Sequence, residues 1–373
     1  MDPIINVVSR KNETLTFCLK GTNVSIANSL RRTIISDIPI IVCRTMVESS
    51  NKCTIHENTS RLHNEIIKQR LSCVPIHISD VENFPYKNYS IELNVENTSS
   101  DIIIVTTGDF TMNDLKTDKK VAKKEVRDIF PPFITGSGEY FIDLLRLRPS
   151  NNSNLSGEKI HLTCLLDKGT AKENGMFNVV SVCSYGFTVD QNKAEPELQK
   201  LKQKWKDDGL VVNEEEKNWR LLEGKRFVLN DSYDFSLKSI GIFTEHQLVE
   251  TACSILIKKV KIQETRMETD EMKIEPSPTT LSNSFDITLS NEDYTIGKAL
   301  EFVLYTKYYE GVKALSYCGF CKFHPHDSDS VIRLAYKEPV DISNVKQHLK
   351  DGMNELVNVY LKLKEESKKL NRV

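Results

Sequence analysis

The densest group of side chains that could do chemistry lies in the stretch CGFCKFHPH, near the C-terminal end. It holds four residues of the types that ligate zinc: Cys318, Cys321, His324 and His326. Structural Cys-x-x-Cys sites usually take a second pair of ligands from much farther along the chain. Interleaved aromatic residues favour a strand that runs into a turn at His324-Pro325. A strand is the preferred interpretation, and a zinc protein or stand-alone enzyme built on this cluster is the alternative.

A second group is the arginine pair Arg31 and Arg32, inside NSLRRTIISDIPI. Four apolar residues, each four positions from the next, share one face of the predicted helix: Ile26, Leu30, Ile34 and Ile38. The two guanidinium groups must therefore point elsewhere. For an isolated pair a solvated helix face is the simplest interpretation, but a planar guanidinium can also bind a carboxylate or a carbonyl at an interface.

The other signatures of catalysis are missing from the sequence. It contains no glycine-rich phosphate loop, no GxSxG, no HExxH and no carboxylate cluster of the kind that holds magnesium. The basic run KTDKKVAKKEVR, which begins at Lys116, has no interleaved aromatic residues, so we expect a solvated loop rather than a nucleic-acid site. The sequence therefore predicts a protein without catalytic residues.

Composition describes an ordinary globular protein of 373 residues. Its 50 basic and 52 acidic residues leave a net charge of −2, so any contact with nucleic acid must be local. The N-terminus has no apolar core of signal-peptide length, and no apolar run approaches a membrane span. Nine cysteines, an odd number, suit a reducing compartment. We expect a soluble, intracellular protein.

The elements around the arginine pair recur near the C-terminal end. LTFCLKGTNVSIANSLRRTII begins at Leu15, and FDITLSNEDYTIGKALEFVLY begins at Phe285, an offset of 270 residues without a gap. Each copy predicts a half-buried strand, a polar turn and a short amphipathic helix. We expect Ser25 and Thr295 to cap the two helices.

Each copy is followed by a longer helical pattern, over 248–260 and 345–363. Two such units can bury their apolar stripes against each other as an internal pseudo-twofold pair. The alternative is that each stripe packs only onto its own sheet. The predicted contact residues of the paired arrangement are Ile26, Leu30, Ile34, Leu256, Ile296, Leu300, Val303, Leu304 and Leu356.

The segments between the copies differ in composition. Residues 263–283 are acidic and rich in Pro, Ser and Thr, which predicts a linker. Short β-like runs in 79–224 predict an inserted, mostly β domain. Within it, a charged, helix-prone stretch from about 190 to 218 precedes Trp219, and we expect Trp205 and Trp219 to be packing anchors. The first unit then comprises 1–78 and 225–262, and the second 284–373.

NSLRRTIISDIPI, followed by the stretch EIIKQRLSCVPI that contains Arg70, resembles the signature of the alpha-like subunits of multisubunit DNA-directed RNA polymerases. The stretch GEKIHLTCLLDKGTAKENGMFNVVSVCSYGF is similar to that family's insertion domain. EDYTIGKAL and YCGFCKFHPHDSDSVIRLAY are similar to the smaller partner subunit. The chain therefore resembles a fusion of the two partners.

This resemblance implies an α+β fold: two alpha-like dimerisation units, each an antiparallel sheet with two amphipathic helices, forming an intramolecular pseudo-dimer with an inserted β-rich domain. It implies a non-catalytic scaffold that recruits the largest and second-largest polymerase subunits, together with smaller ones. DNA and RNA would be met only through the complex, and no membrane is involved. Arg31, Arg32 and Arg70 would contact the large subunits. A free-standing interaction module unrelated to transcription is a further alternative.

Fusions of this kind occur in large DNA viruses, which implies the host cytoplasm, and the virion as a further site. Many relatives hold a metal or an iron–sulfur cluster with four cysteines of the insertion domain. Here that domain offers only Cys164 and Cys183, so we expect no metal and no cofactor.

Overall fold

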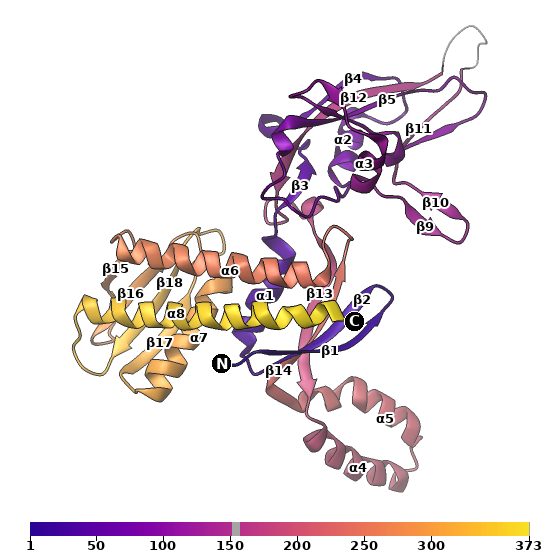
Figure 1. The fold of residues 1–373 in the computed structure, drawn as a ribbon. Helices are drawn as coiled ribbons and strands as arrows, with labels where there is room; N and C mark the ends of the chain where they lie inside the picture. Colours follow the sequence, from indigo (N-terminus) through magenta and orange to yellow (C-terminus); the bar gives the residue numbers. More distant parts are fainter. Residues whose placement is uncertain (151–156, 373) are drawn as a thin grey trace. The chain divides into compact units, whose positions relative to one another are not determined.

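The computed structural model describes residues 1–150 and 157–372 (Figure 1). The chain forms two compact units. The first unit comprises Met1–Ile34, Val182–Lys238 and the chain from Glu245 onward; the second comprises Ile35–Ser181 and Ser239–Thr244. Both are mixed α and β structures, and their strands pair antiparallel. None of the helices within the described ranges is long and apolar enough to cross a membrane.

The N-terminal repeat copy builds a four-stranded sheet in the first unit. Its strands run in the order β1 (Ile4–Lys11), β2 (Thr14–Lys20), β14 (Val228–Ser239) and β13 (Val180–Val189). Stacked rings of Phe17 and Phe235, 5.0 Å apart, join β2 to β14. The two helices that accompany this sheet are α1 (Val24–Ser36) and α6 (Glu245–Glu268).

The C-terminal copy builds a second four-stranded sheet in the same unit. Its strands run in the order β15 (Ile274–Pro276), β16 (Ser284–Leu289), β18 (Ser330–Tyr336) and β17 (Leu315–Cys321). Its two helices are α7 (Tyr294–Leu304) and α8 (Ile342–Glu366). Gly297 of α7 is required for close packing, because a Cβ there would overlap the ring of Phe320 on β17.

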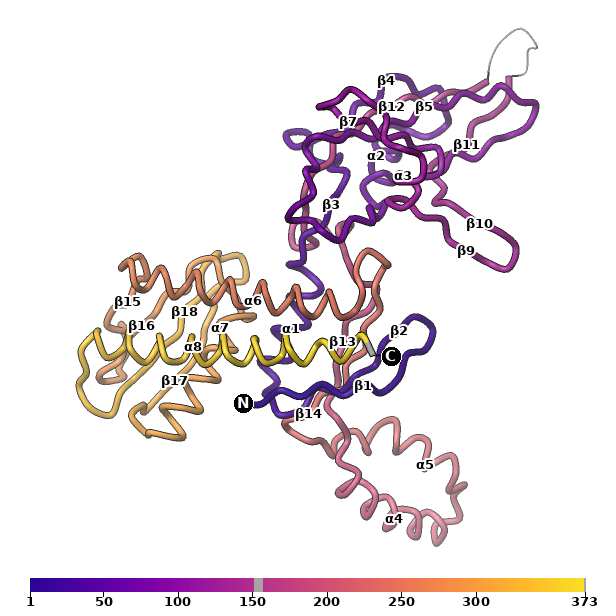
Figure 2. The backbone as a smooth tube through the Cα atoms, viewed as in Figure 1, coloured from indigo at the N-terminus to yellow at the C-terminus, as the bar shows by residue number. Residues whose placement is uncertain are grey.

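The long helices α6 and α8 pack side by side (Figures 1 and 2). Their buried residues recur three and four apart, so each presents one apolar face. Residues of α1 and α6 share a single apolar cluster with the sheet and helices of the C-terminal copy. A hydrogen bond of 2.7 Å between the buried Ser29 and Tyr360 hydroxyls joins α1 to α8.

A charged helical hairpin connects β13 to β14. It consists of α4 (Gln191–Asp207) and α5 (Val212–Leu221). Trp219 is buried in a small core with Leu198, and Trp205 packs against it, as the sequence predicted. An ion pair of 2.7 Å between Lys202 and Glu216 links α4 to α5. A second ion pair, of 2.9 Å between Arg220 and Glu216, lies within α5.

The second unit is built around β12 (Lys159–Gly169). This strand lies between β3 and β5 in a six-stranded sheet and also pairs with β4. The remaining elements are β3 (Ile40–Cys43), β4 (Cys53–Asn58), α2 (Asn64–Ser72), β5 (Tyr89–Glu96), β6 (Ile103–Thr106), β7 (Thr111–Asp114), β8 (Lys119–Lys120), α3 (Lys123–Ile129), β9 (Phe133–Thr135), β10 (Gly138–Tyr140) and β11 (Asp143–Leu147).

Two expectations about irregular segments need correction. The expected linker 263–283 carries regular structure: α6 continues to Glu268, and β15 pairs with β16. Gln263 and Met267 are buried there, so a segment without apolar periodicity is nonetheless held by packing. The basic run from Lys116 is not a plain loop, because it forms β8 and begins α3, whose Val126 is buried.

The compact units also divide the chain differently from the expected domains. The second unit begins at Ile35 rather than at 79, and the helical hairpin lies in the first unit rather than in the β-rich part. The reason is strand pairing: β3 and β4 pair with β12, which ties residues 40–58 to the middle of the chain.

Candidate functional site

The helices α1 and α7 occupy equivalent positions in the two repeat copies and begin in the same way. The Oδ1 atom of Asn23 accepts a hydrogen bond from the Ser25 backbone N–H at 2.9 Å, and Asp293 does the same for Thr295 at 2.8 Å. The expected caps, Ser25 and Thr295, are therefore wrong by two positions. The observed capping residues, Asn23 and Asp293, are again 270 residues apart. Asn and Asp cap helices equally well.

The predicted contact residues are all buried, with at most 1% of their surface exposed. All except Leu30 and Ile34 belong to the apolar cluster that spans both repeat copies: Ile26, Leu256, Ile296, Leu300, Val303, Leu304 and Leu356. Burying a large aliphatic side chain contributes about 1.5–3 kcal/mol. This cluster therefore accounts for much of the attraction between the elements of the two copies.

The two adjacent arginines have different surroundings. Arg32 reaches across to α7, where its Nε donates to the Thr295 hydroxyl at 2.9 Å and its Nη2 to the Asp293 carboxylate at 2.8 Å. Arg31 donates to Oδ1 of Asn28 in its own helix, from Nε at 3.1 Å and from Nη2 at 2.9 Å. Within residues 1–150 and 157–372, Arg31 has no carboxylate at ion-pair distance. Of the two adjacent guanidinium groups, only that of Arg32 is paired with a carboxylate in the described ranges.

Asp293 links the cap of α7 to Arg32. Burial would raise the pKa of its carboxyl, but hydrogen bonds from the Thr295 backbone and hydroxyl, together with the charges of Arg32 and Lys259, lower it to about 2. The ionised carboxylate is therefore stabilised in the folded chain. Asp293 and Arg32 thus form an electrostatic link between α1 and the start of α7.

This link makes stability depend on pH. Because the pKa of Asp293 falls from 3.8 to about 2 on folding, its contribution is fully present above pH 3.8 and is lost as the pH falls towards 2. Asp293→Asn keeps a capping oxygen but removes the charge, so we expect it to lower the free energy of unfolding by about 1 kcal/mol at pH 7, since the pair is partly solvated. The difference from the wild type should vanish near pH 2 in urea titrations. A difference that does not change with pH would contradict this assignment.

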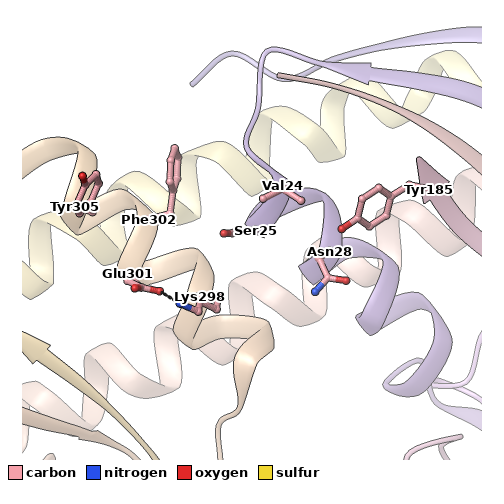
Figure 3. Close-up of a pocket in the computed structure, with 8 residues that line it drawn as sticks. All are labelled: Val24, Ser25, Asn28, Tyr185, Lys298, Glu301, Phe302 and Tyr305. Carbon is pink, nitrogen blue, oxygen red and sulfur yellow. Dashed lines mark ion pairs between the residues drawn. The ribbon is translucent and has the colours of Figure 1, made fainter. Parts of the chain in front are cut away.

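A cavity of about 460 Å³ lies beside the arginine pair, between α1 and α7 (Figure 3). Its lining residues are Val24, Ser25, Asn28, Tyr185, Lys298, Glu301, Phe302 and Tyr305. Asn28 and Lys298 are equivalent positions of the two copies, so the cavity lies where the repeats meet. Lys298 is held by Glu301 at 2.6 Å. The aromatic rings and the neighbouring Arg31 are residue types enriched at the energetic centres of protein interfaces.

Arg70 lies in the second unit, in a different environment. Its Nη2 donates to the backbone oxygen of Asp143 at 3.0 Å. With Arg61, Arg146 and Arg148 it lines a cavity of about 450 Å³ that also includes Asp143, Leu62, Ile102 and Leu145. Arg61 is paired with Glu158 at 3.5 Å, and Asp143 is the one carboxylate residue in this lining. Four guanidinium groups around one cavity favour an anionic partner, and arginine with aliphatic side chains is typical of a protein interface. Three of these arginines were not singled out in the sequence.

The cysteine–histidine cluster forms a strand and a turn, as the spacing predicted. Cys318 and Cys321 are three residues apart on β17, so their side chains leave opposite faces. Burial raises the pKa of the Cys318 thiol to about 12, which disfavours the thiolate that a metal needs. In the part of the chain that the structure describes, no group of three His, Cys, Asp or Glu residues is placed to hold a metal ion.

The two cysteines considered for an insertion-domain metal do not meet as a pair. Cys164 of β12 lies opposite Cys53 of β4 in the second unit, whereas Cys183 belongs to the first unit. Sequence spacing missed Cys53, because cross-strand pairing determines which cysteines meet.

Other important residues escaped the sequence reasoning. Asp293, Ser29 and Tyr360 make polar contacts between the repeat copies. The internal repeat offered one signal for Asp293: aligned copies place this carboxylate at the start of the helix that is equivalent to the arginine-bearing one. The hydroxyl pair of Ser29 and Tyr360 had no sequence signal, since its residues are 331 positions apart.

Comparison with known proteins identifies related sequences. Residues 16–260 match the family model described as RNA polymerase Rpb3/Rpb11 dimerisation domain. DNA-directed RNA polymerase subunit Rpo3 of Pyrococcus furiosus is 24% identical over 277 residues, which are 68% of this chain and 93% of the relative. The human DNA-directed RNA polymerases I and III subunit RPAC1 is 24% identical over 301 residues, 69% of this chain and 82% of the relative. DNA-directed RNA polymerase II subunit rpb3 of Dictyostelium discoideum is 25% identical over 219 residues, 54% of this chain and 65% of the relative.

Proposed function

Because the chain belongs to the RNA polymerase Rpb3/Rpb11 dimerisation domain family, we propose that it is an assembly platform on which the large subunits of a DNA-directed RNA polymerase dock. The relatives are named as polymerase subunits. In this proposal one chain supplies both halves of the platform, as an internal pseudo-dimer, and carries no catalytic residues of its own.

The observation that supports this most strongly is the apolar cluster shared by the two repeat copies. It contains Ile26 of α1 and Leu256 of α6 together with Leu300 of α7 and Leu356 of α8. A continuous apolar cluster of this kind, without charged residues, is typical of obligate interfaces between separate polypeptides. In the proposed pseudo-dimer, this cluster holds the two repeat copies together within one chain. The β-rich second unit is then the inserted domain.

We place the docking surface at two arginine-bearing sites, one on each unit. The first is the α1–α7 surface with Arg31 and the neighbouring cavity, where Arg32 positions α1 against α7 and completes the surface. The second is the arginine-lined cavity around Arg70. Both offer guanidinium forks beside apolar side chains, which suit carboxylates and carbonyls of the largest and second-largest subunits.

Affinity purification tests this function directly. A tagged chain expressed in its native cell should bring down the two largest polymerase subunits in amounts comparable to its own, identified by mass spectrometry. A purified chain that carries neither of them would contradict the proposal. The alternative of a zinc protein or stand-alone enzyme is not favoured, since the relatives are polymerase subunits.

A further inference from the structure

A second cavity of the second unit has a volume of about 590 Å³. It shares no lining residue with the arginine-lined cavity around Arg70. This volume is in the range that small-molecule sites occupy. The residues that line it are Thr107, Gly108, Asp109, Phe110, Thr111, Lys120, Val121, Lys123, Val126, Arg127, Phe130 and Phe141. They come from the segment after β6, from β7 and β8, from α3 and from the segment before β11.

Aromatic rings form the apolar part of the cavity. Phe110 and Phe130 are buried and meet edge to face, with ring centroids 5.0 Å apart. Phe141 is only half-buried, and the Arg127 guanidinium lies 5.6 Å from its ring centroid. Arg127 is in turn held by Glu139 at 2.5 Å. Gly108 packs against the same ring, since a Cβ there would lie 2.9 Å from the Cδ2 atom of Phe141. The Phe141 ring is therefore fixed between these neighbours and only partly accessible.

The polar part of the cavity is cationic. Lys120 and Lys123 line it from β8 and from the start of α3, and both are exposed. In the described ranges, neither lysine has a carboxylate at ion-pair distance. The one carboxylate in the lining, Asp109, accepts the Thr106 backbone N–H at 2.8 Å and is thereby committed to its own turn. Lys120 is near enough to Glu92 to lower the pKa of that carboxyl, but Glu92 does not line the cavity. A ligand in the cavity would therefore meet two lysine charges beside an aromatic wall.

We propose that this cavity binds a nucleotide unit, with its base against Phe141 and its phosphate at Lys120 and Lys123. Stacking on an aromatic ring and charge attraction to lysine are the two interactions that a base and a phosphate require. The basic run looked unsuited to nucleic acid because no aromatic residue interleaves with its charges. Folding supplies these rings from other segments of the chain. This inference is independent of the proposed assembly function.

Two fluorescent probes test the proposal on the full-length chain: a labelled ATP and a labelled single-stranded oligo-dT of about ten nucleotides, both at low salt. Binding of the first identifies a free nucleotide as the source of this chemistry, and binding of the oligonucleotide alone identifies a single strand. In either case Lys120→Gln with Lys123→Gln should weaken binding roughly tenfold or more in fluorescence anisotropy, as should Phe141→Leu.

A matched control removes two charges from the same basic run outside the cavity. Lys116→Gln with Lys124→Gln changes the net charge equally, so it should change the affinity less than about threefold, the size of a non-specific charge effect. Circular dichroism and urea titration establish that each variant is folded. The proposal is overturned if neither probe binds the wild type, or if the control pair weakens binding as much as the cavity pair.

Discussion

Leu356→Asp is expected to lower the free energy of unfolding by at least about 4 kcal/mol, because it creates a cavity and places a carboxylate in an apolar core. Leu356 is completely buried on α8, in the cluster that it shares with Ile26 and Leu256. Urea titrations followed by circular dichroism measure this loss of stability. We expect the variant to be largely unfolded even without denaturant.

Leu361 provides the matched control, five residues along the same helix. Its side chain is 46% exposed, so Leu361→Asp should change the free energy of unfolding by no more than about 0.5 kcal/mol. Equal stabilities of Leu356→Asp and the wild type would contradict the packing of α8 against the first repeat copy. A collapse of Leu361→Asp would show that the charge, rather than its position, causes the loss.

Arg31→Ala is expected to weaken binding of a large polymerase subunit by about 2–4 kcal/mol, roughly 30- to 1,000-fold in Kd, as for arginines at the centre of protein interfaces. The stability of the chain should change little, because among residues 1–150 and 157–372 the side-chain hydrogen bonds of Arg31 go only to Asn28 in its own helix. Titration of the labelled chain with each purified large subunit measures the change.

Two further variants separate the fork of Arg31 from its charge. Arg31→Lys keeps the charge but loses the planar fork, so it should recover only part of the affinity. Arg32→Ala should affect binding less than Arg31→Ala, because its guanidinium is already occupied by Asp293 and Thr295. An unchanged Kd for Arg31→Ala would remove this residue from the docking surface.

Elements with a strong local pattern could be predicted from the sequence. The helical spacing of Leu248 and Val260, and of Val345 and Leu363, correctly predicted α6 and α8. Period-two alternation predicted β2 and β16 at equivalent positions of the two copies. The helix starts were nearly right, because a capping side chain precedes the apolar stripe in each copy.

Long-range pairing explains most of what was missed. Whether Arg32 faces solvent or Asp293 depends on how two helices cross. A short stretch of sequence carries no information about that crossing. The compact units follow the pairing of β3 and β4 with β12, more than 100 residues away. β15 forms because β16 offers an edge, although its own residues are a poor strand sequence that includes Pro276.

Native mass spectrometry of the purified polymerase tests most directly whether one chain supplies both halves of the platform. We expect one copy of this chain for each copy of the largest and second-largest subunits, with no separate small dimerisation partner. Two copies of the chain per complex, or one copy paired with a distinct small partner, would contradict it.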